Sequence, residues 1–494
     1  MSESLFPWLE TAVLAAVVGA VWVGRVREGE TKRKWAIVFS GVVMVCALGL
    51  WTDFLSRDPR PKVLVYPHEW NIFIVDELNG PLLVMTAFLY LLTIFVTARA
   101  KSRRVCFGWT LASEAILLAT LGCQTPWGII ALLAAGTLPP YFELRARGRP
   151  TRVFVLHMGA FVALLVAGWA LVDANVLDSE LAWLALVPLL GAIFIRIGIA
   201  PFHCWMTDLF EHATFGTALL FVAPMVGAFA AVRLVLPVAP DWVLRGIGLV
   251  SLFTALYAAG MALVQNEGRR FFCYVFLSHS ALVLVGVDTI PIIERGGQEV
   301  SLIGLTGGLV VWLSGGLALT GFGLTLRALE ARHGRLSLTR YHGLYEYTPI
   351  LAVCFLLTGL ASLGFPATFG FLGAEMLVDG AVEALPYVGI AIVIVAALSG
   401  IAVVKAYFVL FTGTRHISSV ALALAPRERF AVLLLALLIL LGGLFPQPGV
   451  NSRYFAAEDI IRKRKAWHES RIVGTPPEPR PASSLAREGF EDDR

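Results

Sequence analysis

The sequence predicts an all-α integral membrane protein with about 14 transmembrane helices. Hydrophobic residues make up 57% of its 494 residues and charged residues only 15%, whereas soluble domains carry about 25% charged residues. Mean hydropathy is +0.76. A soluble chain of this length would form several domains with polar surfaces, and this composition holds too little charge to cover them. Strand-like alternation is absent, which argues against a membrane barrel.

Each predicted span is a run of about 20 mostly apolar residues, the length that crosses the hydrocarbon of a bilayer. The first run follows Glu3 and precedes basic residues, so we expect a retained span rather than a cleaved signal peptide. The fourteen runs lie at 6–24, 35–55, 78–98, 105–123, 126–142, 152–173, 182–202, 215–237, 244–265, 271–289, 302–327, 348–372, 384–411 and 427–446.

Basic residues concentrate in the loops after odd-numbered spans, at 25–34, 99–104, 145–152, 269–270 and 332–340. Loops rich in Lys and Arg stay in the cytoplasm. We therefore expect a multi-pass protein of the bacterial inner (cytoplasmic) membrane with both ends outside. The run Arg462-Lys463-Arg464-Lys465 argues mildly against this orientation. From about Gly474 the tail is rich in Pro, Ser and charge, which predicts disorder or ordering on a partner.

Two spans contain a Gly–Pro interruption, around Pro201 in span 7 and Pro366 in span 12. Proline removes a backbone donor and clashes with the preceding turn, so both helices are expected to kink or break in mid-membrane. Paired broken helices five spans apart indicate a repeated unit. Two interpretations stay open: ordinary proline kinks, or an ion or proton path lined by the freed backbone groups.

Ionisable residues inside spans are costly and mark functional candidates. They are Glu114, Arg196, Arg233, His279, Glu375, Asp379 and Lys405. His203, Asp208, Glu211 and His212 cluster after the span 7 break, but their spacing fits no common metal site. Six scattered cysteines without a CxxC motif predict no zinc or iron–sulfur centre. With no nucleotide, flavin or haem motif and no basic patch, we expect no cofactor in this chain and no nucleic-acid partner.

Four stretches of the sequence form a recognisable set. They are Arg196 to Asp208 (RIGIAPFHCWMTD), Leu263 to His279 (LVQNEGRRFFCYVFLSH), His342 to Gly373 (HGLYEYTPILAVCFLLTGLASLGFPATFGFLG) and Ala425 to Gly449 (APRERFAVLLLALLILLGGLFPQPG). Over about residues 70–450 the chain resembles the antiporter-like membrane subunits of respiratory complex I and of Mrp-type cation/proton antiporters. It is most similar to the M-type subunit of bacterial NADH:quinone oxidoreductase.

The resemblance implies two inverted five-helix repeats with broken helices 7 and 12. It divides the chain into helices 1–3 (1–104), a first repeat of helices 4–8 (105–240), a second repeat of helices 9–13 (241–412), helix 14 (413–450) and a polar tail (451–494). It also implies a mid-membrane row of lysines, histidines and glutamates that carries protons. Glu114, His279 and Lys405 match polar positions of the family, and His203 belongs to its span 7 motif.

The row is interrupted in this chain at several positions. The span 7 lysine falls on Arg196, which does not deprotonate in proteins. The span 8 lysine falls on Met225, the span 5 glutamate on Ala134 or Ala135, the span 11 histidine near Ser314, and the span 12 acid or lysine on Ala374, next to Glu375. We therefore expect the fold without most of the proton path, with an Arg196–Glu375 substitute pair as the alternative hypothesis.

Three functional hypotheses follow. The chain is a subunit of a complex I-related or Mrp-like complex associated with proton or cation translocation, or a non-pumping structural subunit of such a complex. The third is the membrane subunit of a Dab-type inorganic-carbon uptake system with a soluble zinc-containing partner. In each case its partners are other membrane subunits and the lipid bilayer. Any redox enzyme activity belongs to those partners, so the chain is at most a non-redox subunit of an NADH:quinone oxidoreductase-like complex.

Overall fold

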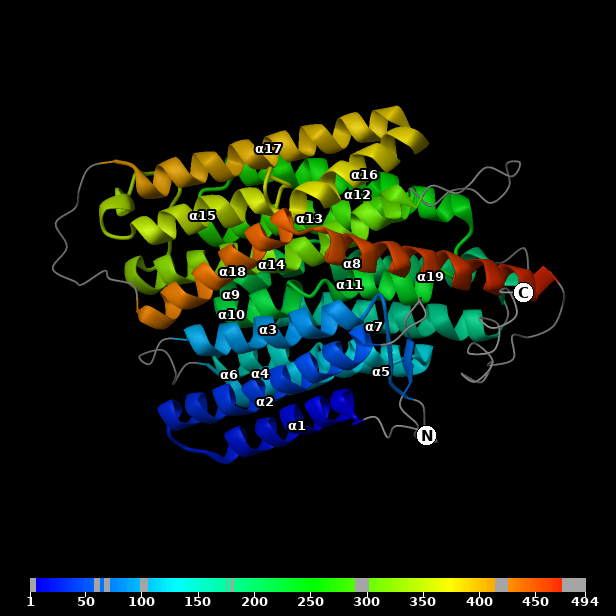
Figure 1. The fold of residues 1–494 in the computed structure, drawn as a ribbon, viewed down its shortest axis with the longest axis horizontal. Helices are drawn as coiled ribbons and strands as arrows, with labels where there is room; N and C mark the ends of the chain where they lie inside the picture. Colours follow the sequence, from blue (N-terminus) through cyan, green and yellow to red (C-terminus); the bar gives the residue numbers. More distant parts are fainter. Residues whose placement is uncertain are drawn as a thin grey trace.

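The computed structural model describes residues 6–56, 63–65, 72–97, 105–174, 176–178, 182–288, 302–413 and 425–472. Helices make up almost all of these residues and run side by side along the long axis of the molecule (Figure 1). In the described part of the chain the only strands are β1 (Val63–Val65) and β2 (Ile74–Asp76), which pair antiparallel. The predicted disordered tail from Gly474 and the basic loop at 99–104 lie outside the described residues.

The N-terminal helices form one side of the bundle (Figure 1). α1 (Trp8–Arg25) packs against α2 (Gly29–Leu55) and α4 (Phe107–Gly122), and α3 (Gly80–Val96) follows the β1–β2 pair. Many apolar side chains of α1 and α2 are exposed, such as Leu14 at 63% and Val45 at 64%. An extended apolar surface of this kind suits lipid or another membrane protein.

Among the segments that follow, α7 matches the predicted span 152–173, whereas the others are shorter and more broken than the sequence predicted. They are α5 (Pro126–Ala135), α6 (Leu138–Ala146), α7 (Arg152–Asp173), η2 (Val176–Asp178), α8 (Trp183–Ile197), α9 (Cys204–His212), α10 (Phe215–Val222), α11 (Val226–Ala230) and the π-helical turn η3 (Ala231–Val235). The stretch Phe215–Val235 is almost wholly buried, so it belongs to the core of the bundle.

Long helices dominate the second half of the chain. They are α12 (Asp241–Val264), α13 (Gly268–Asp288), α14 (Ile303–His333), η4 (Leu344–Glu346), α15 (Pro349–Ala361), α16 (Phe369–Ala384) and α17 (Pro386–Phe411). α13 and α14 are mostly buried, whereas α12 and α17 present apolar faces outward.

The last two helices of the described residues are α18 (Pro426–Leu444) and α19 (Gln447–Ile472), which meet at a bend of 75°. Residues 451–472 of the predicted polar tail thus form a helix. Its apolar side chains Ala456, Ala457, Ile460 and Ile461 are buried, so the helix packs on the bundle.

Nine helices of the described residues are long and apolar enough to cross a membrane, or ten if α18 and α19 count as one bent span. Four further apolar helices, α3, α4, α8 and α15, have 10–17 residues. The all-helical membrane fold is confirmed, while the count of fourteen spans and the inverted repeats stay predictions.

Helices are interrupted at both positions that carry the Gly–Pro signal. α8 ends at Ile197 and α9 begins at Cys204, with Gly198 at φ 88° between them. α15 ends at Ala361 and α16 begins at Phe369, with Gly364 at φ 82°. Positive φ suits glycine because it has no Cβ. A third interruption, between α10 and α11, was not predicted, although Pro224 lies in it.

Candidate functional site

Arg196 lies in the last turn of α8 and is 6% exposed. Its Nη2 donates a hydrogen bond to the carbonyl oxygen of Phe221, at 3.2 Å. The guanidinium carbon lies 4.0 Å from the centre of the Phe221 ring and 5.8 Å from that of Trp205. Trp205 is fixed by its own hydrogen bond to the Ile195 carbonyl. The arginine charge is therefore stabilised by a carbonyl and two aromatic faces.

Met225, at the family's span 8 lysine position by the resemblance, lies next to Arg196 because the break between α10 and α11 packs on the end of α8. Met225 has φ 51° and is the N-cap residue of α11. A Cβ on Gly227 would lie 2.4 Å from the Ile197 side chain. Glycine at this position allows α11 to approach the end of α8. Arg196 and Met225 line one cavity of about 10 Å³ with Met206, Phe276 and Ser280. No carboxylate forms an ion pair with Arg196 in the described part of the chain.

A second cavity, of about 30 Å³, lies beside Arg196 and reaches the end of α5, near Ala134 and Ala135, one of which the resemblance aligns with the family's span 5 glutamate. Leu132, Leu133 and Gly136 line it, and Ala134 belongs to the same turn of α5. The polar pair in this cavity is Tyr90 and Ser113, whose hydroxyl oxygens are 2.7 Å apart. Sequence analysis missed this pair; a tyrosine and a serine inside apolar spans were the available signal.

Glu143 of α6 marks the far end of this polar region and was also missed. It is 2% exposed and accepts hydrogen bonds from the Thr214 backbone N–H, at 2.8 Å, and from the Thr217 hydroxyl. A cavity of about 10 Å³ connects Glu143 and Thr217 with Tyr90 and Ser113. A string of polar groups thus leads from Glu143 to Arg196.

Glu114 does not line either of the two cavities beside Tyr90. It is fully buried on α4, where one carboxylate oxygen accepts a hydrogen bond from the Ser40 hydroxyl of α2 at 2.9 Å. The other oxygen has no hydrogen-bond partner among the described residues. The structure therefore places Glu114 between α4 and α2 rather than beside Arg196.

His203 precedes α9, next to Pro201, and its ring lies 5.4 Å from that of Tyr257 and 5.9 Å from that of Tyr274. In α9, the Asp208 Oδ1 lies 3.1 Å from the His212 Nδ1, and Glu211 forms an ion pair with Arg270 at 2.7 Å. The described residues contain no cluster of three His, Cys, Asp or Glu that could hold a metal ion. The expectation that this chain holds no metal stays a prediction.

His279 of α13 occupies the centre of a separate polar region. Its Nδ1 lies 2.7 Å from the Ser362 carbonyl oxygen, and its Nε2 lies 3.1 Å from the Val311 carbonyl oxygen. Ser314 and Ala374, where the family carries charged or titratable side chains, line the same cavity of about 30 Å³. The structure thus brings these three positions together, but only His279 can titrate.

The remaining sequence candidates point elsewhere. Glu375 and Asp379 are exposed on α16, whereas Arg196 is buried in its own cavity, so the alternative Arg196–Glu375 pair is not brought together. Lys405 of α17 is exposed and its Nζ donates to the Leu263 carbonyl oxygen at 2.8 Å. That carbonyl belongs to the last turn of α12, where helix carbonyls lack partners.

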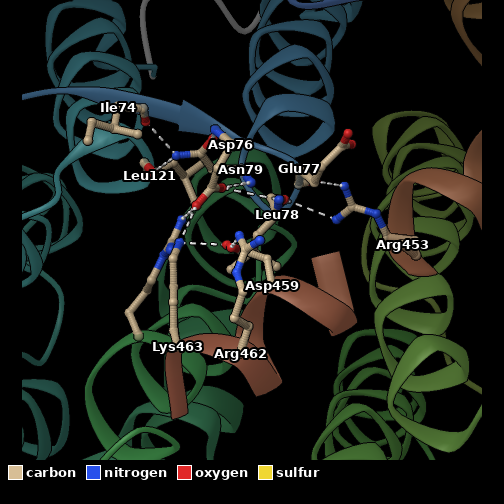
Figure 2. Close-up of polar contacts among 11 residues, drawn as sticks. Ile74, Asp76, Glu77, Leu78, Asn79, Leu121, Arg453, Asp459, Arg462 and Lys463 are labelled. Carbon is tan, nitrogen blue, oxygen red and sulfur yellow. Dashed lines mark hydrogen bonds and ion pairs between the residues drawn. The ribbon is translucent and has the colours of Figure 1, made fainter. Parts of the chain in front are cut away.

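Arg233, also a candidate, belongs to an ionic cluster around Asp76. Figure 2 shows Asp76 and Lys463 of this cluster, which fastens α19 to the start of α3. Asp76 lies 2.7 Å from Arg233 and 3.4 Å from Lys463. Burial would raise the pKa of Asp76, but the two cations and hydrogen bonds from Arg233 and Asn79 hold this pKa well below its usual range. Asp76 thus stays ionised and holds α19 in place.

Two buried arginines of α19 complete this attachment. Arg453 donates to the carbonyl oxygens of Glu77 and Leu78 (Figure 2), and Arg464 binds the Leu236 carbonyl and Asp241. Arg462 and Lys463 also contact Asp459. Three cations of the 462–465 run are therefore paired with acidic residues of the same chain. This basic run thus has a structural role besides any effect on orientation, and the predicted orientation stays a prediction.

Comparison with known proteins gives one family and consistent relatives. Residues 154–400, half of the chain, match the family model of the NADH:quinone oxidoreductase/Mrp antiporter transmembrane region. NAD(P)H-quinone oxidoreductase chain 4 1 of Nostoc sp. is 25% identical over 492 residues, covering 90% of this chain and 89% of the relative. NADH-quinone oxidoreductase subunit M of Pseudomonas aeruginosa is 23% identical, covering 90% and 95%.

A solved structure shows the same fold. A chain of respiratory complex I from Thermus thermophilus superposes with a TM-score of 0.80 at 23% identity, covering 92% of this chain and 99% of that one. The resemblance inferred from the four sequence stretches is confirmed.

Proposed function

Because this chain belongs to the NADH:quinone oxidoreductase/Mrp antiporter transmembrane family, we propose that it is a membrane subunit of a complex I-related or Mrp-like complex that keeps the family fold without carrying protons across the membrane. Its partners are other membrane subunits. This assignment is supported by the relatives, which are named as subunits of quinone oxidoreductases.

The observation that carries the proposal is the environment of Arg196. A proton carrier must gain and lose a proton, and arginine stays charged in proteins. Its guanidinium is held by the Phe221 carbonyl and ring, with Met225 in the adjoining cavity. No second side chain there exchanges a proton with it, so Arg196 acts as a fixed charge.

The path from Arg196 toward His279 supports the same conclusion. The cavity at Arg196 is lined on the α13 side by Phe276 and Ser280, and the cavity at His279 by Ser278. Ser280 donates to the Leu277 carbonyl and Ser278 to the Ala255 carbonyl. Serine hydroxyls do not ionise near neutral pH, so on the α13 side the described residues between the two cavities offer no titratable side chain.

Proton pumping by the purified complex in liposomes tests this proposal. Arg196→Met removes the charge at similar volume, and Glu375→Ala removes the exposed carboxylate of the alternative pair. We expect both variants to assemble and to give the wild-type initial rate of ΔpH formation per electron transferred. A rate about tenfold lower in an assembled complex with normal electron transfer would show that the residue conducts protons and would overturn the proposal.

The identity of the complex is a separate question with a direct experiment. Affinity purification of the full chain in mild detergent, followed by mass spectrometry, identifies its partners. We expect quinone oxidoreductase or Mrp-type membrane subunits. A large soluble zinc protein as the main partner would instead support the inorganic-carbon alternative.

A further inference from the structure

Both ring nitrogens of His279 face carbonyl oxygens, at 2.7 Å for Ser362 and 3.1 Å for Val311. A neutral imidazole has one N–H donor and one acceptor nitrogen, whereas an imidazolium has two donors. A neutral ring would therefore hold a lone pair against a carbonyl lone pair at one of these contacts. Only the doubly protonated ring satisfies both contacts at once.

The two carbonyls belong to different elements. Val311 lies within α14, and Ser362 is the C-cap residue that follows Ala361 at the break between α15 and α16. The carboxyl end of a helix carries partial negative charge, which favours a cation there. The His279 ring thus occupies the position at the α15 terminus where a positive charge is stabilised.

The space for this ring is built into α14. A Cβ on Gly315 would lie 1.8 Å from the His279 Nε2, so glycine at this position lets the ring reach the Val311 carbonyl. The Ser314 hydroxyl also donates to that carbonyl, at 3.1 Å. Val311 therefore keeps a hydrogen bond from a side chain when the histidine contact is lost.

No other titratable or charged group lines the cavity beside His279. Its polar lining consists of serines, Ser278, Ser314, Ser362 and Ser399. The charged and titratable groups on the elements packed against α13 lie in other cavities, near helix ends or on exposed faces: Arg196 on α8, Asp208, Glu211 and His212 on α9, Asp241, Arg245 and Tyr257 on α12, Arg327, Glu330, Arg332 and His333 on α14, Glu375, Asp379 and Glu383 on α16, and Lys405 and Tyr407 on α17.

We infer that His279 is a proton-dependent clamp that ties the α15–α16 break to α14. As an imidazolium it donates to both carbonyls and bridges the two elements. When it releases one proton, one contact is lost and the bridge opens. The adjacent cavity of about 30 Å³ exceeds the roughly 10–15 Å³ that one water needs, so water there can accept the proton.

This clamp does not require that protons cross the protein. It sets the mobility of residues 362–368 by the charge of one side chain. It is therefore independent of the proposed non-pumping role, and neither readout below measures pumping.

The first test observes the ring directly. The full chain, with 15N-labelled histidine and embedded in liposomes, is examined by solid-state NMR at pH 6, and the His279 signal is assigned by its loss in His279→Gln. We expect both ring nitrogens to be protonated. A neutral ring, with one unprotonated nitrogen, would overturn the inference.

The second test measures hydrogen exchange of the backbone amides at 362–368 in the purified complex. His279→Leu keeps the volume of the ring but has no donor, and its rate is compared with wild type at each pH so that intrinsic exchange cancels. We expect the variant to exchange about tenfold faster at pH 6, which corresponds to about 1.4 kcal/mol. The ratio should approach one at pH 9, where wild-type His279 is neutral.

Ser278→Ala is the matched control, because Ser278 lines the same cavity but bonds to the Ala255 carbonyl and lies near Ser399. We expect it to exchange as wild type at every pH. A His279→Leu ratio near one at pH 6, or a ratio that does not change with pH, would overturn the clamp.

Discussion

Asp76→Asn removes the charge at the centre of the contact between α19 and α3 while keeping the size of the side chain. The Asp76 Oδ1 accepts from the Leu78 and Asn79 backbone N–H groups, and an asparagine oxygen accepts them equally well. The change is therefore confined to the ion pairs with Arg233 and Lys463. Lys463 keeps Asp459 at 2.6 Å, so Arg233 is the cation left without an acid.

The size of the effect follows from how buried these groups are. Removing one partner of a buried ion pair costs about 3–5 kcal/mol. The Asp76 side chain is 3% exposed and the Arg233 side chain 19%, so water partly solvates the arginine that remains. We therefore expect α19 to be held less tightly by about 2–3 kcal/mol, a smaller loss than for a fully buried pair.

Hydrogen exchange of the α19 amides, measured by mass spectrometry on the purified complex, reports this loss. Since each 1.4 kcal/mol is tenfold in an opening equilibrium, the amides of α19 should exchange roughly 30- to 150-fold faster in Asp76→Asn. Asp459→Asn is the control, because Arg462 and Lys463 are about half exposed and exposed pairs contribute about 0–1 kcal/mol.

Two results would refute this reasoning: α19 amides in Asp76→Asn that exchange at the wild-type rate, or an equally large effect of Asp459→Asn. The pH dependence provides a further check. The pKa of Asp76 is lowered in the folded state, so its contribution is present above the unfolded value of about 3.9 and is lost only as pH falls through the lower folded value. Protection of α19 in wild type should therefore stay constant from pH 8 to pH 5.

Three further substitutions test the packing and the capping contacts. Gly443→Ala would place a Cβ 2.2 Å from the Ala367 carbonyl oxygen, so we expect a lower melting temperature and a loss of about 1–3 kcal/mol of stability from overpacking. Gly260→Ala in α12 is the control, because a Cβ there meets nothing within 4 Å, and it should be neutral or slightly stabilising. Equal melting temperatures for the two variants would contradict the packing. Lys405→Met removes the cation at the end of α12 and should cost about 0.3–1 kcal/mol of stability with complex activity unchanged; loss of activity at normal stability would instead mark Lys405 as a functional residue.

The sequence predicted the helical membrane fold because lipid restricts composition so strongly. A low share of charge and long apolar runs predict membrane spans, and the prolines at 201 and 366 predict interrupted helices. The interruption at Met225 was missed because a methionine with positive φ has no sequence signature, and Pro224 was not weighed. The lengths of the shorter helices were missed because apolar runs do not show where a helix breaks.

The candidate side chains were predicted less well than the fold. His279, Ser314 and Ala374 line one cavity, an arrangement that the sequence alone did not predict. Lys405 and Glu375 were selected for being ionisable within apolar runs, but that pattern does not say which face of a helix a residue occupies. Glu143 was overlooked because it follows a span in sequence, and only the fold shows that Thr214 and Thr217 enclose it.

The attachment of α19 has a consequence for the synthesis of the protein. Arg453 binds the Glu77 carbonyl across 376 positions of sequence, and the bend before α19 rests on Ala367 and Phe369 at the α15–α16 break. During translation, α3 and the other helices before α19 are made before Arg453 and Lys463 exist. A chain truncated before Arg453 would lack the guanidinium that binds the Glu77 and Leu78 carbonyl oxygens, and would leave Asp76 without Lys463. The contacts at the start of α3 are therefore complete only once α19 has been made.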